Sequence, residues 1–142
     1  MSHQIHQEFN TDLNSLKQVL SWFKQFDQPP IPRQTWLYCQ LALAEGFTNA
    51  VRYAHAQMSP ATPIEIQVLI AKQYLEICIW DYGPPFDLAS YLSMLPETTD
   101  TEAEGGRGLK LINQIADFLS YNRTPDHRNC LVIRKHFVDN SC

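Results

Sequence analysis

Apolar and polar residues alternate most regularly in residues 64–70, which have the sequence Ile-Glu-Ile-Gln-Val-Leu-Ile. Successive side chains of a strand point to opposite faces, so this alternation predicts a strand with one buried face. A second apolar run at residues 74–80 follows a turn at residues 71–73. We expect the two runs to pair as antiparallel neighbours.

Three weaker strand patterns lie near the two ends of the chain. Residues 3–9 are one candidate, and residues 119–122 and 130–137 are two more, joined by a turn through Pro125-Asp126. Turn residues between two short apolar runs favour a hairpin.

Apolar residues recur at helical spacing in three other stretches. The first follows an N-cap at Asn10 or Thr11 and ends before the proline-rich residues 29–32. The second is long, from about residue 33 to residue 56, and the third covers residues 108–118. The order of helices and strands predicts an α+β fold, a two-layer sandwich with three helices on one face of a mixed sheet.

The long helix carries polar residues in an otherwise apolar setting. Residues 41–55 are apolar nearly all round, which predicts a buried helix, yet they include Glu45, Asn49 and Arg52. At about 100° per residue these three side chains share one side of the helix. A buried carboxylate and amide need hydrogen bonds or a metal. The helix alone leaves a plain polar stripe at the edge of the core equally acceptable.

Two glycine-containing motifs follow in order. Asp81-Tyr82-Gly83-Pro84-Pro85-Phe86-Asp87 comes after the second strand, and Gly105-Gly106-Arg107-Gly108-Leu109 begins the third helix. Between them, residues 88–105 are acidic, rich in threonine and poorly periodic, with at most one helical turn near residues 88–94. A loop of this length in a small domain suggests a lid or a disordered segment.

These three motifs, in this order, resemble the N, G1 and G2 boxes of the GHKL superfamily of histidine-kinase-like ATPases. The form DxGxPFD followed by GRGL is most similar to bacterial anti-sigma-factor serine/threonine protein kinases. The resemblance covers almost the whole chain. It implies one histidine-kinase-like ATPase domain over residues 1–142, with the Bergerat ATP-binding fold: a mixed, mostly antiparallel sheet, three helices on one face, and a lid at about residues 84–107.

The resemblance also implies roles for the residues of the long helix. Asn49 would be the protein ligand of Mg²⁺, an ion that prefers oxygen ligands and keeps several waters. Glu45 is the candidate general base for an attacking hydroxyl, and Arg52 would lie near the phosphates. Two plainer interpretations remain: an ion pair of Glu45 with Arg52 or another cation, and a simple surface charge for Arg52.

The two later motifs would hold the base and the phosphates of ATP. Asp81 offers only acceptors, which suits the amino group of adenine, and Gly83 lets the backbone approach the base. The glycines Gly105, Gly106 and Gly108 precede a helix whose N-terminal amides favour anions, with Arg107 and Leu109 completing the motif. An isolated Asp-x-Gly would also fit an ordinary turn.

One departure from the family pattern lies at the last strand. Relatives usually have Gly-Thr there, close to the nucleotide, whereas this chain has Asn129-Cys130. The replacement removes a hydroxyl from the expected site.

Composition narrows the remaining classes of protein. The 142 residues carry a net charge of −4 without a Lys/Arg cluster, so no nucleic-acid partner is expected. Four cysteines lack CxxC spacing and five histidines are scattered, which favours reduced thiols over a disulfide or a His-based metal site. There is no apolar run of about 18 residues and no signal-peptide pattern, so we expect a soluble, cytoplasmic protein with no membrane contact.

The sequence therefore favours an Mg-ATP-dependent serine kinase that phosphorylates an anti-sigma-factor antagonist with a STAS domain and sequesters a sigma factor. The resemblance also implies a homodimer. Three alternatives stay open: a catalytically silent ATP-binding partner-switch module, a histidine-kinase-like catalytic domain, and a hydrolytic ATPase of the chaperone type. The last two are less favoured because no phosphoacceptor or transducer segment is evident.

Overall fold

The computed structural model describes residues 3–94 and 106–138 of the chain. Its five strands form one sheet: β1 (His3–Asn10), β2 (Pro63–Ile70), β3 (Tyr74–Asp81), β4 (Phe118–Arg123) and β5 (Asn129–His136). Their order across the sheet is β1-β2-β3-β5-β4, and all four neighbouring pairs are antiparallel. Each predicted strand is confirmed, with ends that differ by one residue.

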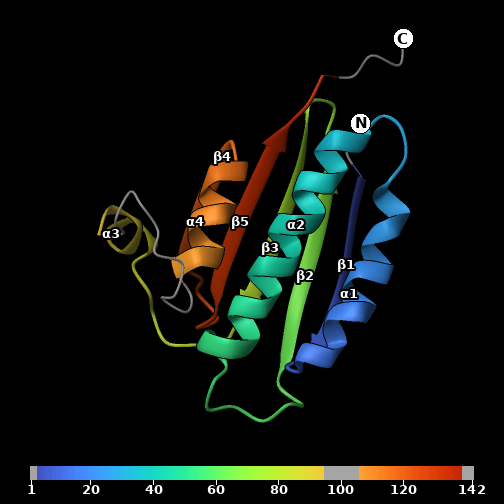
Figure 1. Ribbon diagram of the computed structural model, residues 1–142. Coiled ribbons are helices and arrows are strands. Elements are labelled where there is room, and N and C mark those ends of the chain that lie inside the picture. Colours follow the sequence, from blue (N-terminus) through green and yellow to red (C-terminus); the bar gives the residue numbers. More distant parts are fainter. Residues whose placement is uncertain (1–2, 95–105, 139–142) are drawn as a thin grey trace.

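The helical segments are η1 (Leu13–Ser15), α1 (Leu16–Phe23), η2 (Lys24–Phe26), α2 (Arg33–Asn49), η3 (Ala50–Ala54), α3 (Leu88–Ser93) and α4 (Gly106–Ile115). Helices α1, α2 and α4 cover one face of the sheet, and the short α3 lies beside them (Figure 1). The predicted two-layer α+β sandwich is therefore confirmed. The sheet was expected to be mixed, but its described pairs are antiparallel throughout.

The first helical segment begins later than predicted. Asp12 is its N-cap, with a side chain that accepts a hydrogen bond from the backbone N–H of Asn14 at 2.9 Å. Asn10 instead ends β1, and Thr11 is buried. The cap prediction was off by one or two residues because all three side chains can accept such a bond.

The core lies between the inner face of the sheet and the helices. Ile66, Ile79 and Leu131 sit side by side on three neighbouring strands and are almost fully buried. Helix α1 is tied to α2 by Phe23, whose ring stacks on Trp36 with centroids 5.5 Å apart and whose carbonyl accepts the indole N–H at 3.1 Å.

Helix α2 is only partly enclosed. Leu37, Tyr38 and Leu41 are 37%, 43% and 43% exposed on its outer side, so the prediction of a helix buried all round was wrong on that flank. Apolar composition indicates how much of the surface of a helix can be buried. The number of layers packed against the helix determines how much of that surface is buried.

Gly46 marks the closest approach of α2 to the sheet. A Cβ atom at this position would lie 2.7 Å from Cδ1 of Ile79 and 3.4 Å from Cδ2 of Leu131. Glycine in a helix interior costs about 1 kcal/mol relative to alanine, so its presence needs a packing reason. That reason is the contact with β3, which brings the adjacent residues of α2 close to the end of that strand.

We expect Gly46→Ala to lower the free energy of unfolding by about 1–2 kcal/mol, although alanine is the better helix former, because overpacking costs about 1–3 kcal/mol. Chemical denaturation measures this change. Ala44→Gly is the matched control and should cost about 1 kcal/mol through helix propensity alone. A more stable Gly46→Ala protein would contradict the packing argument.

Candidate functional site

One cavity of about 280 Å³ brings together residues from seven elements, from α2 to β5. Three of its lining residues were selected from the sequence: Asn49, Asp81 and Leu109. The second motif also contributes Pro84, Pro85 and Phe86, and the long helix stretch contributes Gly46, Ala50, Tyr53 and Ala54, which were assigned no site role from the sequence. The lining residues outside the motifs are Ile79, Leu88, Tyr91, Tyr121 and Leu131. Residues from all three sequence motifs therefore face the same space.

Asp81 is the polar centre of this cavity. It is the last residue of β3 and only 3% exposed. Its Oδ1 accepts the backbone N–H of Gly83 at 2.8 Å and the side-chain amide of Asn129 at 2.9 Å, and its Oδ2 accepts the hydroxyl of Tyr121 at 2.6 Å. Three donors stabilise a carboxylate whose burial alone would be costly.

Tyr121 brings a hydroxyl to the cavity, although the expected threonine of the last strand is replaced by Cys130. Residue 121 is on β4, opposite Leu131 of β5, and its phenol reaches Asp81 from across the sheet. Burial and the negative charge of Asp81 raise the pKa of Tyr121, so the hydroxyl stays protonated and remains a donor. The sequence carries only a weak signal for this role, since Tyr121 is a single tyrosine at an inward-facing position of a short strand.

Aromatic rings form much of the cavity wall. Phe86 lies 5.3 Å from Tyr91 and 5.9 Å from Tyr121, measured between ring centroids, and Tyr53 contributes a fourth ring. Such rings offer faces and edges against which a further flat ring can pack in an offset or edge-to-face arrangement.

Glu45, Asn49 and Gly108 meet at the start of α4. A Cβ atom on Gly108 would lie 2.8 Å from Oε2 of Glu45 and 3.3 Å from Nδ2 of Asn49. Nδ2 of Asn49 is also buried without a hydrogen-bond partner among the described residues. An orphaned buried amide at a helix N-terminus is the polar group that an anionic ligand would satisfy.

The alternative of an ion pair between Glu45 and Arg52 is not formed in the described part of the chain. Glu45 makes no ion pair there, and Arg52 is exposed and does not line the cavity. The prediction that places Arg52 near a phosphate therefore has no support from its position.

Arg52 lies in a segment where the helix changes its pitch. Residues Ala50–Ala54 form a π-helical turn, closed by the N–H of His55 on the carbonyl of Ala50 at 2.8 Å. The predicted helix thus ends as an α-helix at Asn49. A single π-turn at the end of a helix shifts the side chains that follow it, and such turns are frequent at functional sites.

Gly83 packs against this π-turn. A Cβ atom on it would lie 2.8 Å from the carbonyl oxygen of Ala54 and 2.9 Å from its Cβ. From the sequence alone, the expected reason for this glycine was the approach of a base to the backbone. The structure gives a contact within the protein that requires glycine whether or not a base is bound.

His55 connects the π-turn to the loop that follows Asp81. It is 1% exposed; its Nε2 accepts the backbone N–H of Tyr82 at 2.8 Å, and its Nδ1 lies 2.8 Å from the hydroxyl of Thr11. That hydroxyl donates to the carbonyl of Thr62 at 2.6 Å, so the imidazole proton is on Nδ1. Burial lowers the pKa of His55, and the charge of Asp81 offsets part of this effect.

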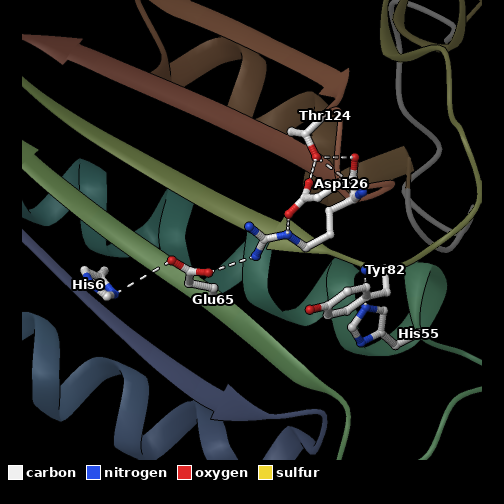
Figure 2. A network of polar contacts seen from close by, with 7 residues as sticks. His6, His55, Glu65, Tyr82, Thr124 and Asp126 are labelled. Atoms are coloured by element: carbon white, nitrogen blue, oxygen red, sulfur yellow. Dashed lines mark hydrogen bonds and ion pairs between the residues drawn. The ribbon is translucent and has the colours of Figure 1, made fainter.

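A second network holds Tyr82 from the hairpin between β4 and β5 (Figure 2). The guanidinium of Arg128 bridges Oε1 of Glu65 and Oδ2 of Asp126, both at 2.8 Å. It also lies over the rings of Trp80 and Tyr82, at 5.5 and 5.9 Å from their centroids. The residue after Asp81 is thus fixed by His55 through its backbone and by Arg128 through its ring.

The remaining residues of the glycine-rich motif are at the edge of the described structure. Gly106 and Arg107 begin α4, and Leu109 lines the cavity. Gly105 and residues 95–105 of the predicted lid lie outside the described residues, as does the side chain of Arg107. Within residues 84–94, the predicted helical turn is confirmed as α3.

Two features are absent from the described ranges, residues 3–94 and 106–138. They contain no cluster of three His, Cys, Asp or Glu side chains able to hold a metal ion by themselves. They also contain no helix that is long and apolar enough to cross a membrane.

Comparison with known proteins gives one family match. The model of the histidine kinase-like ATPase domain matches residues 9–135 of this chain.

Curated relatives and a solved structure extend this match. The serine-protein kinase RsbW of Staphylococcus aureus is 31% identical over 91 residues, which cover 61% of this chain and 57% of the relative. RsbW of strain bovine RF122 / ET3-1 is 32% identical over 83 residues, covering 55% and 52%. The chain thus spans little more than half the length of these relatives. The SiaB-SiaC complex from Pseudomonas aeruginosa contains a similar fold, with a TM-score of 0.56, 11% identity, and coverage of 94% of this chain and 89% of that chain.

The lowered pKa of His55 predicts a loss of stability in acid. The unfolded chain binds a proton near the ordinary value of 6.5, while the folded protein resists it, so the free energy of unfolding should fall as the pH drops below about 6.5. Urea titrations between pH 8 and pH 5 measure this slope. His55→Gln should have the shallower slope, and His3→Gln, at an exposed position, should keep that of the wild type. Equal slopes for His55→Gln and the wild type would contradict the assignment.

Proposed function

Because the chain belongs to the family of histidine kinase-like ATPase domains, we propose that it is an Mg-ATP-dependent serine kinase of the anti-sigma-factor type. Residues 1–142 form its single ATPase domain, with a lid at about residues 84–107. The observation that carries the proposal is the meeting of Asn49, Asp81 and Leu109, one residue from each motif, at one aromatic-lined cavity.

The base of ATP binds in that cavity. Asp81 accepts the amino group of adenine on the free lone pair of Oδ2, because Oδ1 already accepts two hydrogen bonds. The rings of Phe86 and Tyr121 pack against the base, and Pro84 and Pro85 form the adjoining wall.

The phosphates bind beside the N-terminus of α4. The unpartnered amide of Asn49 supplies a free donor beside this helix end, and both suit an anion. Gly105, Gly106, Arg107 and Leu109 complete the phosphate-binding segment. Arg52 is the weakest of the proposed contacts, since it is exposed.

The same side chains fit a magnesium ion carried by the nucleotide. Asn49 would hold it through one amide oxygen, which suits a hard cation that takes most of its other ligands from water and phosphate. When bound, the ion supplies charge neutralisation for the transferring phosphoryl group. Glu45 accepts the proton of the attacking serine hydroxyl, and its carboxylate has no competing ion pair in the described residues.

The relatives named serine-protein kinase support a protein serine as the phosphate acceptor, and the partners proposed here are those that the family resemblance implies. The phosphate acceptor is a STAS-domain anti-sigma-factor antagonist, and the competing ligand is a sigma factor. The protein acts as a homodimer in the cytoplasm.

A catalytically silent ATP-binding module is the second candidate. This alternative was raised because the chain has Asn129-Cys130 where relatives usually have Gly-Thr. The hydrogen bonds of Asn129 and Tyr121 stabilise the charged carboxylate of Asp81 at the cavity, which supports its role as an acceptor for the base. The phosphoserine assay with Glu45→Gln and Asn49→Ala decides whether phosphate is transferred.

Asp81→Asn should weaken ATP binding while the protein stays folded. The new amide can turn its oxygen toward the donors on Gly83 and Asn129 and its NH₂ toward Tyr121, whose hydroxyl accepts as well as donates. The adenine amino group then meets a donor, at a cost of about 1–3 kcal/mol. Calorimetry with ATP tests this, with Asp12→Asn as a matched control at the N-cap of η1. Equal affinity in Asp81→Asn and the wild type would refute the base assignment.

Glu45→Gln and Asn49→Ala should separate catalysis from binding. Glu45→Gln should keep most ATP affinity and lose about 10²–10⁴-fold in phosphate transfer, the usual cost of removing a general base. Asn49→Ala should lose binding and transfer together. The measurement is phosphoserine formed on a STAS-domain antagonist, with Glu8→Gln, at an exposed position of β1, as control. A wild type that binds ATP and transfers nothing would favour the silent module.

A further inference from the structure

Asn129 is hydrogen-bonded to the backbone of residues 82–87, the loop between β3 and α3, which we call the base-reading loop. It is the first residue of β5, lies opposite Asp81 in the sheet, and is 1% exposed. Besides its hydrogen bond to Oδ1 of Asp81, its Nδ2 lies 3.1 Å from the carbonyl oxygen of Gly83 and 3.1 Å from that of Pro84. One buried amide thus contacts the carboxylate at the end of β3 and two successive carbonyls of the loop between β3 and α3.

The orientation of this amide follows from its neighbours. The three groups near Nδ2 are acceptors: a carboxylate and two carbonyls. On the other side, Nη1 of Arg123 lies 3.4 Å from Oδ1 of Asn129 and donates to the carbonyl of Gly83 at 2.8 Å. A guanidinium has no acceptor, so only the amide oxygen can face it. A flipped amide would place donor against donor and acceptor against acceptor.

This amide limits what the carboxylate of Asp81 can still accept. An oxygen of a carboxylate has two lone pairs. On Oδ1 both are used, by the N–H of Gly83 and by Asn129, and on Oδ2 one is used by Tyr121. A single acceptor position therefore remains, on Oδ2.

We propose that Asn129 is the positioning residue that makes this cavity select adenine over guanine. It does so by closing Oδ1 of Asp81, that is, by occupying the lone pair that the N–H of Gly83 leaves free. The inference rests on the proposed function, in which a nucleotide base lies against Asp81. Guanine offers two neighbouring donors, its ring N1–H and its amino group, which pair with both oxygens of an open carboxylate. Adenine offers one amino donor next to an acceptor and needs one carboxylate oxygen. When Oδ1 is closed, the carboxylate can no longer make the two hydrogen bonds to guanine, but it can still accept the single hydrogen bond from adenine.

The test is the ratio of the dissociation constants for GTP and ATP, measured by calorimetry. Asn129→Ser shortens the side chain, so its hydroxyl cannot reach Asp81 and the second lone pair of Oδ1 becomes available to a donor of the base. We expect the ratio to fall at least about tenfold, the consequence of one mispaired hydrogen bond. Asn122→Ser is the matched control: it makes the same substitution at an exposed position of β4 and should keep the wild-type ratio.

The dissociation constants for ATP and GTP also show whether Asn129 positions Asp81 or only stabilises the fold. A loosened fold weakens ATP and GTP alike and leaves the ratio unchanged, whereas an opened Oδ1 changes the ratio. Tyr121→Phe removes the donor on Oδ2 while Oδ1 stays closed, so it should keep the preference for ATP. If melting curves show that Asn129→Ser does not fold, Asn129→Ala replaces it, because a methyl group has no donor for Asp81, and the same fall in the ratio is expected.

The outcomes are distinct. A folded Asn129 variant that keeps the wild-type ratio overturns the inference and leaves the proposed function intact. The same holds if Tyr121→Phe lowers the ratio and the Asn129 variants do not, since Tyr121 would then determine selectivity. A wild type that binds neither nucleotide overturns the proposed function and the inference together.

Discussion

A carboxylate buried at the end of a strand has to be surrounded by donors, and the candidate site is arranged around this requirement at Asp81. An isolated buried charge would cost several kcal/mol. Here the donors come from three places: the backbone of Gly83, the amide of Asn129 on β5 and the hydroxyl of Tyr121 on β4. Each of them also fixes its own segment relative to β3. The need to satisfy one charge therefore determines how the loop after β3 and the β4–β5 hairpin lie against each other.

Three close approaches bring the other motifs to this centre, and each occurs at a glycine. Gly46 lets α2 pack on β3, Gly83 lets the loop pack on the π-turn at Ala54, and Gly108 lets α4 pack on Glu45 and Asn49. A Cβ atom at any of the three would lie within 3.0 Å of a neighbour. The glycines of the sequence motifs therefore serve the packing of the protein as well as the approach of a ligand.

The π-turn and His55 extend the same arrangement toward the first strand. His55 follows the turn and links Thr11, just after β1, to the backbone of Tyr82, next to Asp81. Its neutral imidazole acts as acceptor on one side and donor on the other, which no protonated histidine can do. The position of the base-reading loop thus depends on a buried group whose charge state is set by burial, and on Arg128 at the outer side of the sheet.

The sequence by itself determined the local elements and the order of the motifs. Alternation predicted the strands β2 and β3, helical spacing predicted α2 and α4, and the ordered motifs pointed to the ATPase family that the family model then matched. The tertiary structure alone revealed the donors from Tyr121 and Asn129, the aromatic wall, the π-turn and the linkage through His55. The physical reason is range: periodicity reports on residues a few positions apart, whereas Tyr121 and Asn129 are 40 and 48 residues from Asp81. Contacts over such distances depend on strand order and register, which no local pattern of apolar and polar residues specifies.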